Sequence, residues 1–158
     1  MKTLLFDLDG TMYRGTQIIE SAKTFLEHCQ KQNIPYLFLT NNSMRTREEN
    51  VIHMENMGYT GISPDQFYNS AMASVQYVRS HYSNTAYYIG KEGMKQALLD
   101  EGFTITDQNP DFVFVGLNKD ADYAQYSKAL QLLLNGAKLI GTNQDRILAK
   151  PGGFEMGN

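Results

Sequence analysis

The stretch LLFDLDGT, residues 4–11, decides the fold, because a short apolar run leads there straight into two aspartates and a turn. Asp7 ends the apolar run, and Asp9 follows two positions later. The run has the length and composition of a β-strand, so both carboxylates fall where the strand leaves the core. A carboxylate that loses hydration without a partner costs stability. The pair therefore indicates a chemical role, which a divalent cation and phosphate chemistry would supply.

Outward from this strand, short apolar segments alternate with longer segments of helical periodicity. This alternation is typical of an α/β protein with a largely parallel sheet. Strands are expected at residues 4–7, 35–40, 66–69, 86–89, 112–115 and 138–142, and helices at about 20–33, 46–57, 70–82, 91–101 and 122–135. The nearly continuous apolar character of residues 35–40 predicts a strand buried on both faces. Residues 151–158 look like a turn about to enter a new element.

The composition narrows the class of protein. The 158 residues carry a net charge of -3 with both signs scattered, so no basic field favours nucleic acid or an anionic membrane. A single cysteine, Cys29, fits a reducing compartment. Asp7 and Asp9 interrupt what would be the apolar part of a signal peptide, and no apolar run is long enough to span a bilayer. We expect a cytoplasmic protein without nucleic-acid or membrane partners, and the oligomeric state stays open, a homo-oligomer included.

A second polar segment, TNNS at residues 40–43, follows the strand expected at residues 35–40. Ligands collect at the carboxyl ends of parallel strands, so Asp7 and Thr40 should converge if their strands are neighbours. The segment offers a hydroxyl, amides and backbone N–H groups just before a helix, which suits phosphoryl oxygens. Asp7 is the candidate nucleophile and Asp9 the candidate acid and base. Capping of the next helix is the alternative role for Thr40 and Asn41.

Five segments together resemble the haloacid-dehalogenase (HAD) superfamily of phosphatases, and most closely its NagD-like, p-nitrophenyl-phosphatase branch. They are DLDGT at residues 7–11, LTNNS at 39–43, NSAMA at 69–73, NGAK at 135–138 and TNQD at 142–145. The resemblance implies Mg²⁺-dependent hydrolysis of a small phosphomonoester, such as a sugar phosphate or nucleotide, through an aspartyl-phosphate on Asp7. Asp9 would be the general acid and base, and Thr40 and Asn41 would hold the phosphoryl group. The Asp7 carboxylate and the Asp9 backbone carbonyl would bind the metal.

The resemblance also implies a domain organisation. Residues 1–82 would be the N-terminal part of a HAD-like, Rossmann-type parallel-sheet core that lacks its C-terminal strands. Residues 83–158 would be an incomplete α/β cap inserted over the active site, with a boundary near Ser83. Asn143 and Asp145 are then substrate-facing positions in the cap, and an ordinary turn is the alternative.

The sequence departs from the family pattern in one respect. Family members continue past the cap to a lysine beside the phosphate and to a Gly-Asp motif that completes the metal site, and neither motif is visible here. Lys150 comes too soon after Asp145 to be that lysine. A catalytically impaired fragment or a phosphate-binding module is therefore the alternative function, and a phosphotransferase would share every residue named. Residues 4–6 are expected to form an exposed apolar edge, which favours self-association.

Overall fold

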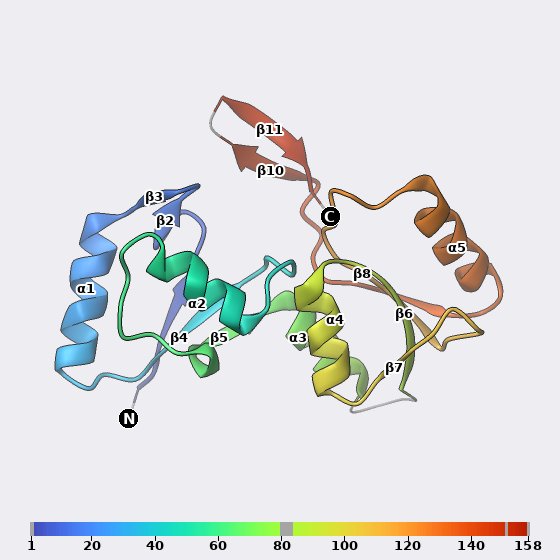
Figure 1. The fold of residues 1–158 in the computed structure, drawn as a ribbon, viewed down its shortest axis with the longest axis horizontal. Coiled ribbons are helices and arrows are strands. Elements are labelled where there is room, and N and C mark those ends of the chain that lie inside the picture. The colour runs from blue at the N-terminus through green and yellow to red at the C-terminus, as the bar shows by residue number, and fades with distance from the viewer. Residues whose placement is uncertain (1, 80–83, 151, 158) are drawn as a thin grey trace. The chain divides into compact units, whose positions relative to one another are not determined.

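The computed structural model describes residues 2–79, 84–150 and 152–157, and its residues pack as two compact units (Figure 1). The first unit contains residues 1–40 and 47–68, and the second contains residues 41–46 and 69–158. The segment 41–46 therefore leaves the first unit, packs in the second and returns. The domain boundary expected near Ser83 falls at residues 80–83, outside the described residues, and stays a prediction.

The first unit is built on a parallel sheet of strand order β1-β4-β5. Its strands are β1 (Leu4–Asp7), β4 (Tyr36–Thr40) and β5 (Phe67–Asn69), and its helices are α1 (Glu20–Lys31) and α2 (Arg47–Glu55), followed by a short 3₁₀ turn η1 (Pro64–Gln66). The strands step across the sheet in one direction. Helix α1 connects β1 to β4, and α2 lies between β4 and β5. Because connections between parallel strands are right-handed, both helices fall on the same face of the sheet.

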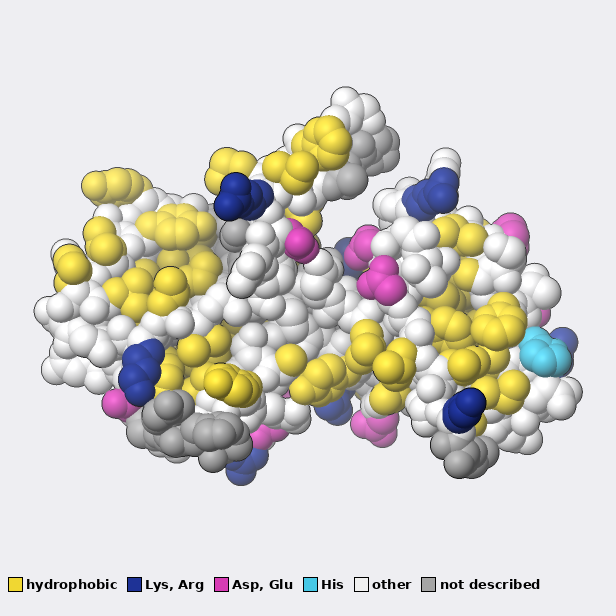
Figure 2. Space-filling view, turned by 180° about the vertical axis from the view of Figure 1, so that it is seen from behind, with side chains coloured by type: hydrophobic (Ala, Val, Ile, Leu, Met, Phe, Trp, Pro, Cys, Tyr) yellow, Lys and Arg dark blue, Asp and Glu magenta, His cyan; other side chains and the backbone are white. Residues whose placement is uncertain are grey.

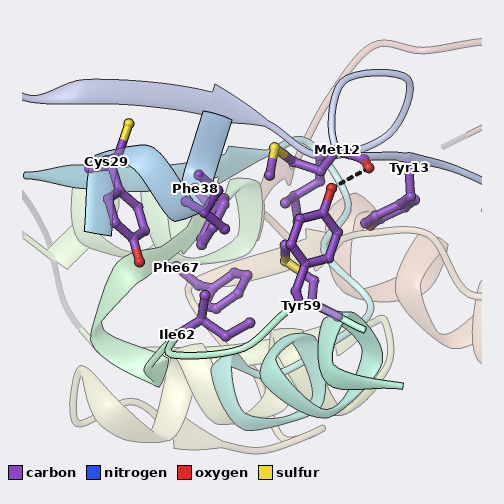
Figure 3. Packing of buried hydrophobic residues seen from close by; sticks show 11 residues of the cluster. Met12, Tyr13, Cys29, Phe38, Tyr59, Ile62 and Phe67 are labelled. Atoms are coloured by element: carbon purple, nitrogen blue, oxygen red, sulfur yellow. Dashed lines mark hydrogen bonds between the residues drawn. The ribbon is translucent and has the colours of Figure 1, made fainter. Parts of the chain in front are cut away.

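One face of this sheet is therefore much better covered than the other. Phe38 is fully buried and packs in one core with Cys29 of α1 and Met54 of α2 (Figure 3). Along β4, Tyr36, Phe38 and Thr40 are buried, whereas the two leucines between them are only half-buried. The expectation that this strand is buried on both faces is wrong, because both neighbouring helices pack against the Phe38 side.

The second unit contains a four-stranded parallel sheet of order β7-β6-β8-β9, with helices on both faces. Its strands are β6 (Thr85–Ile89), β7 (Thr104–Ile105), β8 (Phe112–Val115) and β9 (Lys138–Gly141), and its helices are α3 (Ser70–Arg79), α4 (Glu92–Asp100) and α5 (Tyr123–Leu134). Phe112 and Phe114 face α3 and α4, while Val113 faces α5. The parallel α/β architecture expected from the alternating pattern is confirmed.

Two small hairpins were not expected from the sequence. The first pairs β2 (Tyr13–Arg14) with β3 (Gln17–Ile18), directly after the turn that carries Asp9. The second pairs β10 (Ile147–Lys150) with β11 (Gly153–Met156), where only a turn was recognised. Ile147, Phe154 and Met156 are exposed on this second hairpin, which is seen at the top of Figure 2.

No helix among the described residues is both long enough and apolar enough to cross a membrane.

Candidate active site

Asp7 and Thr40 lie at the same end of neighbouring strands in the first unit. The parallel register pairs Asp7 of β1 with Leu39 of β4, so Thr40 is the next residue along. The Asp7 side chain is exposed at this edge, whereas Thr40 is buried. The carboxyl ends of adjacent parallel strands are where α/β proteins bind ligands. The structure thus brings together these two residues in the way that their strand-end positions predicted.

A hydrogen-bonded turn places Asp9 just beyond the end of β1. The Gly10 N–H donates to the Tyr13 carbonyl over 2.7 Å, and the Met12 N–H donates to the Leu8 carbonyl over 2.9 Å. Gly10 has a φ of 90°, a left-handed conformation that glycine adopts without steric cost. Asp9 itself is exposed. The turn therefore holds a second carboxylate close in sequence to Asp7 on a fixed backbone.

Buried side chains anchor this turn to the core of the first unit. Leu8 and Met12 are almost completely buried, and the Tyr59 hydroxyl donates a 2.6 Å hydrogen bond to the Met12 carbonyl (Figure 3). Burial, and to a lesser degree the nearby negative charge of Glu20, raises the pKa of Tyr59 to about 12. The phenol therefore stays protonated at neutral pH and keeps donating to the turn.

Asn41 follows Thr40 in the chain but makes its contacts within the second unit. Its side-chain amide donates to the carboxylate of Asp145. Its carbonyl accepts a 2.6 Å hydrogen bond from the Ser70 hydroxyl and a 3.2 Å hydrogen bond from the Asn143 amide. The structure therefore brings together Asn41, Asn143 and Asp145, which the sequence had placed at separate positions of the candidate site.

Ser70 is the residue of this network that the sequence reasoning missed. It is the first residue of α3 and directly follows β5, so its strand-end position was a signal that could have found it. Its neighbour Asn69 is buried and donates a 3.1 Å hydrogen bond from its amide to the Arg45 carbonyl. Together these two residues fix both ends of the segment 41–46.

Close backbone packing holds the middle of the same segment. Ser43 is buried, and a Cβ on Gly116 would lie only 2.7 Å from its hydroxyl oxygen. A Cβ on Gly93 would lie 2.6 Å from the Ser43 carbonyl oxygen and 2.4 Å from that of Arg45. The Gly93 N–H donates a 2.9 Å hydrogen bond to the Met44 carbonyl. The segment therefore fits against α4 and the end of β8 only because glycines stand at both places.

The donor set at the end of β1 suits a magnesium ion. No group of three or more His, Cys, Asp or Glu side chains that could hold a metal occurs within residues 2–79, 84–150 and 152–157. Mg²⁺ does not need such a cluster, because it usually binds through one or two carboxylates, substrate phosphate and water. The exposed carboxylate of Asp7 and the nearby backbone oxygens are hard ligands of this kind.

The fold is α/β, with acids at the carboxyl end of a parallel strand, and comparison with known sequences gives its family. Residues 4–104 match the family described as haloacid dehalogenase-like hydrolase. The acid sugar phosphatase of Staphylococcus epidermidis is 39% identical over 156 residues, which cover 98% of this chain and 60% of that protein. The 5'-nucleotidase YutF of Bacillus subtilis is 35% identical over 158 residues, which cover 99% of this chain and 61% of that protein.

Solved structures agree with this assignment. A double mutant of the thermostable NPPase from Geobacillus stearothermophilus is 40% identical with a TM-score of 0.88, covering 99% of this chain and 62% of that one. NagD from E. coli K-12 is 32% identical with a TM-score of 0.83, and the match covers 92% of this chain and 58% of that one. The chain belongs to the haloacid dehalogenase-like hydrolase family and has the expected HAD-like fold. It spans about 60% of the length of the curated relatives it matches.

Proposed function

We propose that the protein carrying this chain is a Mg²⁺-dependent phosphatase that hydrolyses small phosphomonoesters, such as sugar phosphates or nucleotides. The observation that carries the proposal is the register of β1 and β4, which sets the Asp7 carboxylate beside the end of the strand bearing Thr40. Relatives named as an acid sugar phosphatase and a 5'-nucleotidase support this class of substrate.

In the first step, a carboxylate oxygen of Asp7 attacks phosphorus. A new O–P bond forms on Asp7 while the ester P–O bond breaks, and Asp9 gives its proton to the departing alkoxide oxygen. Thr40 and Asn41 donate hydrogen bonds to the oxygens of the transferred group. The product alcohol leaves, and the phosphoryl group remains on Asp7 as an acyl phosphate.

In the second step, Asp9 takes a proton from a water molecule, and the water oxygen attacks phosphorus. The Asp7–phosphorus bond breaks, so inorganic phosphate leaves and both aspartates return to their starting states. The exposed position of Asp9 on its turn allows exchange of this proton with solvent. Asp7 is thus the nucleophile of the first step and the leaving group of the second, while Asp9 acts first as the acid and then as the base.

The residues that would hold the metal are Asp7, through its carboxylate, and Asp9, through its backbone carbonyl. When bound, Mg²⁺ offsets the repulsion between the Asp7 carboxylate and the phosphate dianion and stabilises charge that develops in the transition state. Residues 1–82 would then be the catalytic core and residues 83–158 a cap. A cytoplasmic location is part of the same proposal, since the free Cys29 fits a reducing compartment.

Substitution of the two aspartates tests the proposal in the complete protein that carries this sequence. With p-nitrophenyl phosphate and Mg²⁺, Asp7→Asn should abolish turnover, because an amide is a poor nucleophile. Asp9→Asn should lower kcat by about 10²–10⁴-fold, the usual contribution of a general acid and base. Removing Mg²⁺ with EDTA should abolish activity, and returning it should restore turnover.

The matched control is Asp65→Asn, which changes an acid of the first unit whose side chain is 94% exposed. This variant should keep wild-type activity. Mass spectrometry of acid-quenched protein should also find a phosphoryl group on Asp7. Full activity in Asp7→Asn would refute the proposed nucleophile.

A further inference from the structure

We propose that Asp145 is a positioning residue, whose carboxylate orients Asn41, the residue of segment 41–46 that would donate to the phosphoryl group. The inference rests on the proposed function, because that function gives Asn41 its role toward phosphate. The contacts that carry it all lie within the second unit, to which residues 41–46 and 69–158 belong.

A closed ring of hydrogen bonds joins the residues concerned. The Asn41 amide donates to the Asp145 carboxylate. The Asp145 N–H donates to the Asn143 side-chain oxygen over 2.9 Å, and the Asn143 amide donates to the Asn41 carbonyl over 3.2 Å. Asn41 and Asn143 are 102 positions apart in the sequence. The ring therefore ties segment 41–46, which begins with Asn41, to the loop that follows β9.

The ring fixes the backbone of Asn41 as well as its side chain. Its carbonyl accepts hydrogen bonds from both Ser70 and Asn143. In a trans peptide the C=O and the next N–H point in opposite directions, and the described residues contain no cis peptide. The direction of the Asn42 N–H is therefore set by the same contacts, so the ring orients a backbone donor together with the Asn41 amide.

The chemistry of Asp145 favours positioning over direct contact with phosphate. An ionised carboxylate only accepts hydrogen bonds, as do phosphate oxygens, so a hydrogen-bonded link from Asp145 to a phosphoryl group needs a donor between them. Asn41 is such a donor, since its amide carries two N–H bonds. Both side chains are exposed, so the contact adds little to folding stability. Misplacement of a binding group by about 1 Å, in contrast, can cost about 10²-fold in rate.

A double-mutant cycle in the complete protein tests the inference. The variants are Asn41→Ala, Asp145→Ala and the pair, with kcat and KM measured on p-nitrophenyl phosphate in the presence of Mg²⁺. The control is Asp100→Ala, which removes another exposed carboxylate of the second unit that accepts from a side-chain amide, that of Gln96 over 2.7 Å. Asp145→Asn serves as the conservative variant, because its side chain keeps an acceptor oxygen.

We expect Asp145→Ala to lower kcat/KM about tenfold or more, with an unchanged midpoint of urea unfolding. Asp145→Asn should recover part of this loss, and Asp100→Ala should match the wild type. The pair should be no worse than Asn41→Ala alone, because Asp145 acts through Asn41. Wild-type kinetics in Asp145→Ala would overturn the inference. So would a loss of kcat/KM in the double variant that equals the product of the two single losses.

A second measurement separates this inference from the proposed function. The NMR signals of the Asn41 side-chain amide should shift in Asp145→Ala and stay in place in Asp100→Ala. In the wild type these signals should also respond to added inorganic phosphate, and the response should weaken in Asp145→Ala. If the wild type hydrolyses no phosphomonoester, the proposed function fails while these signals still decide the positioning role. An Asn41 amide indifferent to Asp145→Ala refutes that role.

Discussion

At the scale of single residues, Tyr59 links the turn that carries Asp9 to the core of the first unit. Its buried hydroxyl donates to the Met12 carbonyl over 2.6 Å (Figure 3). Tyr59→Phe leaves that carbonyl without this donor and should lower the free energy of unfolding by about 1–3 kcal/mol. Urea unfolding followed by circular dichroism measures the change. Tyr123→Phe is the control, since Tyr123 is 89% exposed, and it should unfold like the wild type.

The same residue predicts a pH dependence of stability. Burial raises the pKa of Tyr59 to about 12 in the folded state, above the usual value of 10.0. The folded state therefore holds the phenolic proton more tightly than the unfolded state, and stability falls as the pH rises from 10 toward 12. The effect is at most about 1.4 kcal/mol per pH unit.

Unfolding curves of the wild type and Tyr59→Phe at pH 8, 10 and 11 test this expectation. Phenylalanine has no proton to lose, so the free-energy difference between the two proteins should shrink as the pH rises above 10. If the free-energy difference between the two proteins stays constant over this pH range, the pKa of Tyr59 is not raised in the folded state.

At the scale of elements, the fit of α4 against residues 41–46 depends on Gly93. A Cβ at this position would lie 2.4 Å from the Arg45 carbonyl oxygen, and the backbone cannot give way as a flexible side chain can. Gly93→Ala should therefore destabilise the protein by about 1–3 kcal/mol, as overpacking of a tight contact does. It should also lower kcat, because the displaced segment carries Asn41.

The control for this substitution is Gly153→Ala in β11, where an added Cβ meets nothing within 4 Å. Thermal unfolding and phosphatase assays on both variants provide the comparison. Wild-type stability in Gly93→Ala would mean that the segment can move away from α4 without cost.

The elements also show what local sequence could and could not predict. Strands β1, β4 and β8 were predicted because apolar runs of three or four residues mark them, and α1 because its apolar residues recur at helical spacing. The two-residue strands β2 and β3 were missed, since so short a pair has no measurable period. Burial of β4 on both faces was predicted, but Leu37 and Leu39 are only half-buried, because burial depends on where the helices pack.

The candidate site also combines features that local sequence predicts with a contact that only the fold creates. Asp7, Asp9 and Thr40 were proposed as site residues because strand ends are recognisable locally, and the register of β1 and β4 agrees with the expected proximity of Asp7 and Thr40. The bond from Asn41 to Asp145 joins residues 104 positions apart, so no local pattern contains it. The sequence had marked both residues, but their pairing comes only from the fold.

At the scale of the whole molecule, β1 is an edge strand that pairs only with β4 among the described residues. Leu5 of this strand is 60% exposed, on the sheet face opposite the packed helices. Unpaired N–H and C=O groups beside apolar side chains are a template for pairing with another chain. A polypeptide of these 158 residues should therefore self-associate, with an average mass that rises with concentration above 17.9 kDa.

Leu5→Lys should reduce this association, because a charge on an edge strand opposes pairing. Light scattering after size-exclusion chromatography measures the mass of each variant. The matched control is Leu130→Lys, since Leu130 is 57% exposed but lies on helix α5 of the second unit. If Leu130→Lys restores a monomer while Leu5→Lys does not, association runs through the apolar surface of α5, and the edge-strand prediction is wrong. A monomeric wild type at all concentrations would contradict it as well.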